Sequence, residues 1–146
     1  MKEKLVCISG GFDPIHIGHI RYIQKAAQLG TKLWAILNTD DFLLRKKGYV
    51  FMSQSERKEV LWNIKGIDNV VLCIDKDNTV CKTLEMIKPN IFAKGGDRTN
   101  NNIPEASICE KIGIKMYFGI GGYNKPQSSS WLINNLSMYL KEKKNI

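Results

Sequence analysis

The sequence has 146 residues, of which 43% are hydrophobic and 25% charged, values that suit one globular domain over residues 1–146. The longest apolar runs, such as residues 5–8, are far too short to span a bilayer, so a membrane-spanning protein is not expected. The first residues lack the long apolar stretch and the small-residue cleavage site of a signal peptide, and we expect a cytoplasmic protein with no membrane partner.

Short apolar runs alternate with segments of helical periodicity along the chain. Strands are predicted at residues 4–9, 32–37, 69–74, 91–93 and 115–118. Helices are predicted at residues 18–29, 53–64, 79–87, 104–112 and 128–141. Gly30 is expected to cap the end of the first helix, and Ser53 with Glu56 forms a capping box at the start of the second. This order is typical of an α/β fold in which helices cover both faces of a parallel sheet, with ligands at the carboxyl ends of the strands.

The net charge is compatible with several classes of ligand, and the cysteines indicate the redox state of the compartment. A formal net charge of +8 fits nucleic acid, polyanionic small molecules or simply a basic surface. Because the basic residues are scattered and no RNA-binding aromatic signature is present, a nucleic-acid partner is not expected. The four cysteines, Cys7, Cys73, Cys81 and Cys109, lack zinc-knuckle spacing, which favours free thiols in a reducing compartment.

The segment from residue 10 to residue 19 is the most informative part of the sequence. After the first predicted strand, Gly10 and Gly11 let the backbone approach a ligand closely. Gly18 and His19 then open a helix, whose N–H groups and dipole favour phosphate. His16 lies three residues before His19, so both imidazoles can reach one point and stabilise charge on a transferring phosphoryl group. A solvent-facing histidine pair or half of a metal site is the alternative.

Gly-Phe-Asp at residues 11–13, followed by His-Ile-Gly-His at residues 16–19, matches the signature of the cytidylyltransferase-like nucleotidyltransferases. The sequence resembles this family over nearly its whole length. It looks closest to the branch that contains glycerol-3-phosphate cytidylyltransferase, heptose-phosphate adenylyltransferase and archaeal FAD synthase. The resemblance implies a Rossmann-like three-layer sandwich with a five-stranded parallel sheet, of the HxGH type. It also implies CTP or ATP and a phosphorylated small molecule as substrates, Mg²⁺ held mainly by phosphates, release of pyrophosphate, and a homodimer.

Further basic residues are assigned by their place in the family's pattern. Lys46 and Lys47 belong to a basic run that we interpret as a mobile loop, in which one of the two lysines holds the β- or γ-phosphate. A solvated charge run is the alternative. Arg57 and Lys65 match basic positions of the family, and we expect both near the acceptor. For Arg57 the alternatives are an anchor for the active-site loop, a contact with the phosphates or a plain surface position.

Two later segments complete the predicted site. The family has a Gly-Asp-rich turn beside the ribose and base, which residues 95–97 match. Residues 128–130 are three serines at the start of the last helix, where hydroxyl and N–H groups can cradle a second anion. Cytidylyltransferases often carry an Arg-Thr-Glu-Gly lead-in to this cradle, and here Lys125 stands in for the arginine.

The predicted site therefore has three groups of residues. The catalytic residues are His16, His19, Lys46 and Lys47. The nucleotide-binding residues are Gly10, Gly11, Phe12, Asp13, Gly18, Gly95, Gly96, Asp97, Ser128, Ser129 and Ser130. The acceptor-binding residues are Asp13, Arg57, Lys65 and Lys125.

The expected reaction is transfer of CMP, or of AMP, from the nucleotide to glycerol phosphate or a sugar phosphate. The phosphate oxygen of the acceptor is ionised at neutral pH, so it needs no general base, and catalysis rests on positioning and charge stabilisation. Adenylyl transfer to heptose 1-phosphate or FMN is the alternative reaction. A nucleotide- or nucleic-acid-binding module without turnover is the alternative from another class, and only the net charge supports it.

Overall fold

A computed structural model of the chain describes residues 2–96, 103–122 and 127–144. Its centre is a parallel five-stranded sheet with the strand order β3-β2-β1-β4-β5. The strands are β1 (Leu5–Gly10), β2 (Lys32–Leu37), β3 (Asn69–Leu72), β4 (Ile91–Gly95) and β5 (Lys115–Ile120). All five predicted strands are present, and their ends differ from the prediction by at most two residues.

Six helices are present in the described residues: α1 (Ile17–Ala27), α2 (Asp40–Lys47), α3 (Gln54–Trp62), α4 (Cys81–Ile87), α5 (Ala106–Ile112) and α6 (Ser129–Lys144). Five of them correspond to predicted helices. Ser53 is the N-cap of α3, and its hydroxyl accepts a hydrogen bond from the Glu56 N–H, which is one half of the predicted capping box. Gly30 is not the C-cap of α1, because Gln28 is; instead, a Cβ at Gly30 would lie 2.5 Å from the Lys4 carbonyl oxygen.

The prediction of a mobile loop around Lys46 and Lys47 is wrong, because these residues form the last turn of α2. The Thr39 hydroxyl caps the start of this helix, and Gly48 ends it with a left-handed φ of 85°. Acidic residues occupy its first turn and basic residues its last turn, and these charges interact favourably with the helix dipole. The two lysines are therefore held on a regular element.

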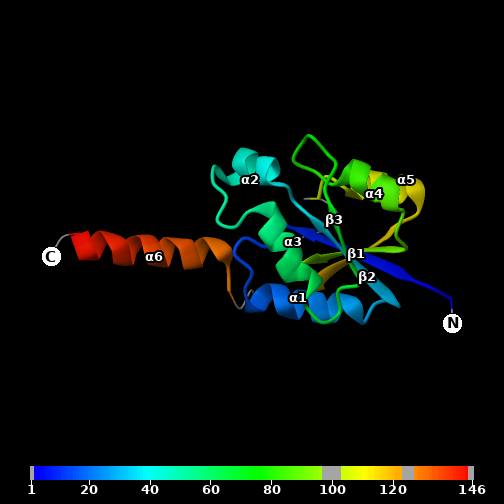
Figure 1. Cartoon of the computed structure of the whole chain (residues 1–146). Coiled ribbons are helices and arrows are strands. Elements are labelled where there is room, and N and C mark those ends of the chain that lie inside the picture. Colours follow the sequence, from blue (N-terminus) through cyan, green and yellow to red (C-terminus); the bar gives the residue numbers. More distant parts are fainter. Residues whose placement is uncertain (1, 97–102, 123–126, 145–146) are drawn as a thin grey trace.

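The layers follow from the alternation of side chains along the strands. Val6 and Ile8 point into one apolar cluster, shared with Ile23 of α1 and Leu61 of α3. Cys7 points into a second cluster on the opposite face, which also contains Phe42, Leu84 and Cys109 from α2, α4 and α5. Figure 1 shows α1 and α3 on one side of the sheet and α4 and α5 on the other. The structure is thus the predicted Rossmann-like three-layer α/β sandwich.

Helix α6 differs from the other helices because it projects away from the sheet (Figure 1). Within the described residues, no helix combines the length and the apolar character needed to cross a membrane. All four cysteines are free thiols, as predicted: Cys7, Cys73 and Cys109 are buried, and Cys81 is half-buried.

Candidate active site

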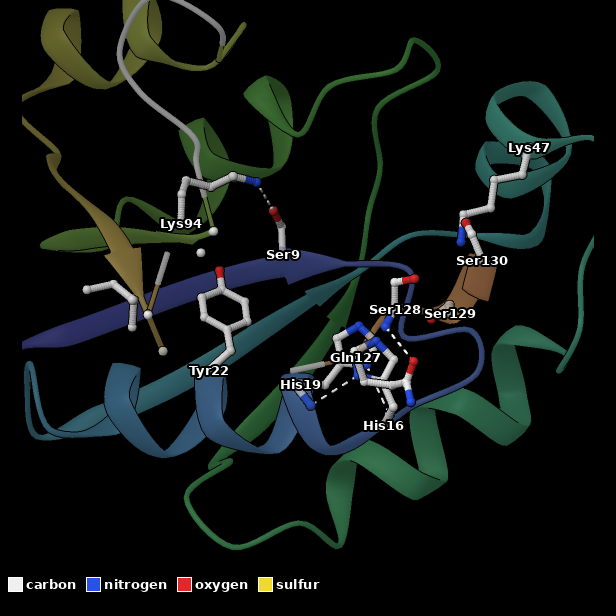
Figure 2. A pocket seen from close by; sticks show the side chains of 16 residues that line it. Ser9, His16, His19, Tyr22, Lys47, Lys94, Gln127, Ser128, Ser129 and Ser130 are labelled. Carbon is white, nitrogen blue, oxygen red and sulfur yellow. Dashed lines mark hydrogen bonds between the residues drawn. The ribbon is translucent and has the colours of Figure 1, made fainter. Parts of the chain in front are cut away.

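A cavity of about 340 Å³ opens at the carboxyl ends of the central strands (Figure 2). It lies where β1 neighbours β4, the point at which the strand order reverses and where open α/β sheets bind ligands. Helices α1 and α6 both begin at its edge. The residues that line it are Ser9, His16, Gly18, His19, Tyr22, Lys47, Lys94, Gly95, Gly96, Ile120, Gly121, Gly122, Gln127, Ser128, Ser129 and Ser130.

The two histidines build the start of α1 together. His16 is the N-cap residue, and its Nδ1 accepts a hydrogen bond of 3.0 Å from the Gly18 N–H. Nδ1 of His19 in turn accepts one of 3.2 Å from the His16 N–H, which completes a reciprocal capping box. The rings stack with their centroids 3.9 Å apart. Hydrogen bonds from the backbone at the start of α1 therefore hold both imidazoles in place.

These bonds also decide where the ring protons lie. An Nδ1 atom that accepts a backbone N–H has no proton of its own, so a neutral imidazole carries its proton on Nε2. His16 and His19 thus share one tautomer, and both rings line the same cavity. Two N–H donors with fixed orientation are suited to stabilising negative charge that develops on a phosphoryl group.

Gly18 leaves the room that this arrangement needs. A Cβ atom at Gly18 would lie 2.8 Å from Cε1 and 3.0 Å from Nδ1 of His16. Any side chain at this position would therefore displace the His16 imidazole. Gly18 therefore protects the position of the His16 ring.

Lys47 is the basic residue of α2 that lines the cavity. Lys46 is exposed, and its ammonium group lies 5.9 Å from the ring centroid of Phe42. Burial lowers the pKa of Lys47, and the charges of Lys46 and Arg57 act in the same direction, whereas Asp13 opposes them. Of the two lysines predicted to act on the triphosphate, the structure places only Lys47 at the cavity.

The serines at the start of α6 also lie at the cavity. The Ser128 hydroxyl accepts a hydrogen bond of 3.0 Å from the Trp131 N–H and so begins the helix. The Ser129 hydroxyl donates one of 2.8 Å to the Pro14 carbonyl, which ties α6 to the loop between β1 and α1. Ser130 completes the predicted trio. The fold therefore brings residues 16–19 and residues 128–130 together, as the sequence predicted.

The paired glycines after β4 form another wall. Gly95 and Gly96 line the cavity, and a Cβ at Gly95 would lie 3.2 Å from the Ile120 carbonyl oxygen and 3.5 Å from the Tyr22 ring. Tyr22 follows His19 by one turn of α1, and its hydroxyl donates to the Ala93 carbonyl. On this side of the cavity, the backbone of Gly95 packs closely against the Tyr22 ring, so a side chain at residue 95 would have little room.

The chain matches the family described as cytidylyltransferase-like over residues 7–118, which is well over half of its length. The chain belongs to the cytidylyltransferase-like family. This match covers the strands and helices that carry His16, His19, Lys47 and Gly95.

Several relatives of this cytidylyltransferase-like chain are proteins named "Bifunctional protein HldE". The one from Citrifermentans bemidjiense is 38% identical over 113 residues, which cover 76% of this chain and 23% of the relative. The one from Gluconobacter oxydans is 36% identical over 115 residues, which cover 77% and 24%. The chain thus spans about a quarter of the length of these relatives.

A solved structure has the same fold over nearly the same length. The lipopolysaccharide core biosynthesis protein from Thermoplasma volcanium aligns with a TM-score of 0.69 and 26% identity. The alignment covers 84% of this chain and 100% of that protein.

Two residues predicted to contact substrates instead brace the cytidylyltransferase-like site from within. Asp13 is fully buried, and its carboxylate accepts hydrogen bonds of 2.7 and 2.6 Å from the N–H groups of Phe51 and Met52. Arg57 is 1% exposed and donates to the carbonyls of Met52, Gly11 and Asn38 and to the Asp40 carboxylate. The assignment of both side chains to the acceptor is therefore corrected, since protein groups occupy them.

Three further predicted contacts support the site without lining the cavity. A Cβ at Gly11 would lie 2.8 Å from Cδ2 of Leu43, and one at Gly10 would lie 3.2 Å from the Phe12 ring. Phe12 is 3% exposed, and its ring centroid lies 4.9 Å from that of His19. These glycines make room for neighbouring side chains behind the histidines, and the nucleotide contacts predicted for Gly10, Gly11 and Phe12 stay predictions.

Lys65 lies at the wrong edge of the sheet for a role in the site. It follows α3 and precedes β3, and a Cβ at the adjacent Gly66 would lie 3.5 Å from Cβ of Ala27, at the end of α1. This is the amino edge of the parallel strands, opposite the cavity, so the assignment to the acceptor is wrong. Asp97 and Lys125, two other predicted contacts, lie outside the described residues.

Seven residues line the cavity that the predicted site did not include: Ser9, Tyr22, Lys94, Ile120, Gly121, Gly122 and Gln127. Some of them carried a signal. Lys94 directly precedes the paired glycines, and Tyr22 lies on the same face of α1 as His19. Ser9 carried none, because its place depends on the pairing of β1 with β4.

Mg²⁺ is implied by the family resemblance. Among residues 2–96, 103–122 and 127–144, no group of three or more histidine, cysteine, aspartate or glutamate side chains could hold a metal ion. Asp13, the carboxylate of the motif, gives both oxygens to backbone N–H groups. The described side chains therefore do not form a Mg²⁺ site, and the roles proposed below belong to the chain's own residues.

Proposed function

We propose that the chain is an enzyme that moves a nucleoside monophosphate from CTP or ATP to a phosphorylated small molecule and releases pyrophosphate. The observation that carries this proposal is the reciprocal histidine capping box, which points two fixed imidazoles into a cavity that Lys47 and three serines also line. Membership of the cytidylyltransferase-like family supports it.

The proposed step is an in-line displacement at the α-phosphorus. A phosphate oxygen of the acceptor forms a new bond to phosphorus, while the bond to the β-phosphate oxygen breaks and pyrophosphate leaves with the electron pair. Nε2–H donors of His16 and His19 stabilise the α-phosphoryl oxygens, where charge is concentrated in the transition state. Lys47 and the N-terminus of α6 bind the β- and γ-phosphates. Mg²⁺ would supply additional positive charge for the leaving pyrophosphate, and no described side chain is assigned to hold it.

The proposal favours a sugar phosphate as acceptor. The structural relative is named as a lipopolysaccharide core biosynthesis protein, which points toward sugar chemistry. Of the branches that the sequence resembles, the one with a sugar phosphate is the heptose-phosphate adenylyltransferase branch. From the sequence we expect CMP transfer first. These observations support its stated alternative, which is AMP transfer from ATP to heptose 1-phosphate. The absent arginine of the cytidylyltransferase lead-in also favours ATP.

The test is a pyrophosphate-release screen that crosses CTP, ATP, GTP and UTP with heptose 1-phosphate, other sugar phosphates, glycerol 3-phosphate and FMN. We expect release that depends on both substrates with one pair from this panel. His19→Ala should then lower kcat by about 10²- to 10³-fold, because one oxyanion donor is lost. No release with any pair, or near-normal turnover by His19→Ala, would contradict the proposal.

A binding module without turnover is the competing function, and the net charge of +8 is its support. Heparin or DNA affinity that falls steeply with salt, in the absence of any pyrophosphate release, would favour that function. A homodimer, a cytoplasmic location and a need for Mg²⁺ remain parts of our proposal. Loss of turnover on removal of divalent cations with EDTA, and its recovery with Mg²⁺, tests the last of these.

A further inference from the structure

Helix α6 begins at the cavity and ends far from it. Ser128, Ser129 and Ser130 at its start line the cavity, whereas every residue from 134 to 144 is exposed. Figure 1 shows its last turn remote from the sheet and from helices α1–α5. A bare helix of this length is only marginally stable in water, because tertiary packing supplies most helical stability. The exposed length of α6 therefore needs a partner surface.

The apolar face of α6 is symmetric about Leu136. Leu132 and Leu140 lie four residues before and after it, and Ile133 and Tyr139 lie three residues before and after it. All five positions fall on one side of the helix. A two-fold axis through Leu136 would therefore set each of these side chains against an apolar side chain of an antiparallel second copy. This self-complementarity identifies a second copy of the chain as the occupant of the face.

The same symmetry relates Ser129 to Lys143. These residues lie seven positions before and after Leu136, which is two helical turns, so both share the line of the apolar face. Within one chain, Lys143 is about 21 Å from Ser129 along the helix axis, at the usual rise per residue. Its ammonium group lies 5.6 Å from the centroid of the Tyr139 ring. In the antiparallel pair, Lys143 of one copy would lie beside Ser129 of the other.

Charge complementarity supports this placement. The start of α6 lies at the cavity near Lys47 (Figure 2), where the proposed function binds the negatively charged β- and γ-phosphates. The axes of packed helices lie about 9 Å apart, a gap that a lysine side chain can bridge. We propose that Lys143 of each copy enters the triphosphate subsite of the other copy, so that two chains build each complete site. This inference rests on the proposed function and deepens it.

Binding of inorganic triphosphate tests the inference without turnover. Calorimetric titration of the full chain gives the affinity, and light scattering coupled to gel filtration gives the oligomeric state of each variant. Lys143→Gln should stay a dimer and bind triphosphate about 5-fold more weakly, because an ionic contact with phosphate is lost. Lys143→Arg should keep the wild-type affinity. Lys141→Gln removes the same charge from the opposite face of α6 and should change neither property.

Dissociation of the dimer should have the same effect as loss of the lysine. Leu136→Glu places a charge at the centre of the apolar face, and the resulting monomer should also bind triphosphate about 5-fold more weakly. Adding Lys143→Gln to this monomer should weaken binding no further, because Lys143 cannot reach the cavity of its own chain. The difference between wild type and Lys143→Gln should shrink at high salt, since exposed charges are screened.

Mixed dimers, made by co-expression with two affinity tags, show which chain supplies the lysine once an active substrate pair is known. In a dimer of Lys143→Gln with His19→Ala, the chain with both histidines receives Lys143 from its partner, so the KM of the nucleotide should equal that of wild type. In a dimer of wild type with a chain that carries both substitutions, this KM should rise about 5-fold. The reverse pattern would assign Lys143 to its own site.

That reverse pattern would overturn the inference, as would wild-type triphosphate affinity in Lys143→Gln. A wild-type protein that stays monomeric in the presence of triphosphate, or that uses α6 to bind vesicles of anionic lipid as a monomer, would also overturn it. Each of these results leaves pyrophosphate release by the wild-type protein intact. Failure of the proposed function is distinguishable, because it appears as no pyrophosphate release by wild type with any substrate pair.

Discussion

At His16 and His19, the nitrogen that caps the helix also decides which nitrogen carries the proton. Capping boxes are usually built from Ser or Thr with Glu or Gln. An imidazole has two nitrogens, so one can satisfy the backbone while the other faces a ligand. Chemistry and helix initiation therefore depend on the same two rings.

Lys47 makes the activity sensitive to alkaline pH. Burial lowers its pKa, so the folded protein loses this positive charge at a lower pH than an exposed lysine would. We expect kcat/KM for the nucleotide to fall as pH rises through this lowered pKa. Lys47→Arg should move the fall to higher pH, because a guanidinium stays charged there.

The measurement is the pH profile of kcat/KM, which reports ionisations of the free enzyme and free substrate. Lys46→Arg is the matched control, since Lys46 is exposed and packs beside Phe42. The same alkaline limb in wild type and Lys47→Arg would show that another group titrates.

At the scale of the element, the geometry at the start of α1 depends on Gly18 having no side chain. Gly18→Ala would place a Cβ 2.8 Å from Cε1 of His16 and push the imidazole aside. A misplacement of about 1 Å in a catalytic group can cost about 100-fold in rate, so we expect a loss of that order in kcat. Thermal stability should not fall by a comparable amount, because alanine favours helix more than glycine does.

Gln24→Ala, at an exposed position of the same helix, is the control for this substitution. It should leave both turnover and melting temperature near wild type. Wild-type activity in Gly18→Ala would mean that the observed position of the His16 ring is not needed for catalysis.

Arg57 links four segments of the chain, and its side chain is completely buried. Arg57→Met would leave the carbonyl oxygens of Gly11 and Asn38 without their donor and Asp40 without its cation. We expect the free energy of unfolding to fall by about 3 kcal/mol, measured by urea denaturation. Lys58→Met, one residue along and half-exposed, should cost far less. A loss below about 1 kcal/mol for Arg57→Met would contradict the bracing role.

The elements show how far the sequence could predict this fold. The strands and five of the helices carry strong apolar periodicity or clear caps, and the prediction located them. Helix α2 was missed because its charged residues outweigh its apolar ones, although Thr39 and Gly48 are recognisable caps. The histidine motif was located because it is local. The hydrogen-bond partners of Asp13 and Arg57 could not be predicted, because they lie up to 46 residues away in the sequence.

At the scale of the whole molecule, α6 leaves a large apolar surface uncovered. Leu132, Ile133, Leu136, Tyr139 and Leu140 share one face at helical spacing, and Leu136, Tyr139 and Leu140 are each about half exposed. Exposed apolar stripes of this kind mark interaction surfaces. We therefore expect a second copy of the chain to cover this face and form the homodimer that the family resemblance implies.

Light scattering coupled to gel filtration tests this expectation. Wild type should elute with the mass of a dimer, and Leu136→Glu should shift it to a monomer because a charge enters the apolar face. Asn134→Glu places the same charge on the opposite face of α6 and should remain a dimer. A monomeric wild-type protein at micromolar concentration would refute the pairing.

The Ser129–Pro14 hydrogen bond has a consequence for synthesis of the protein. Residues 9 and 130 both form walls of the cavity, so the pocket needs chain segments that leave the ribosome at very different times. His16 and His19 leave the ribosome early, and the serines at residues 128–130 are translated more than a hundred residues later. A nascent chain can therefore fold much of its sheet before it can hold a nucleotide, and chains that stop short of residue 128 should be released without this pocket.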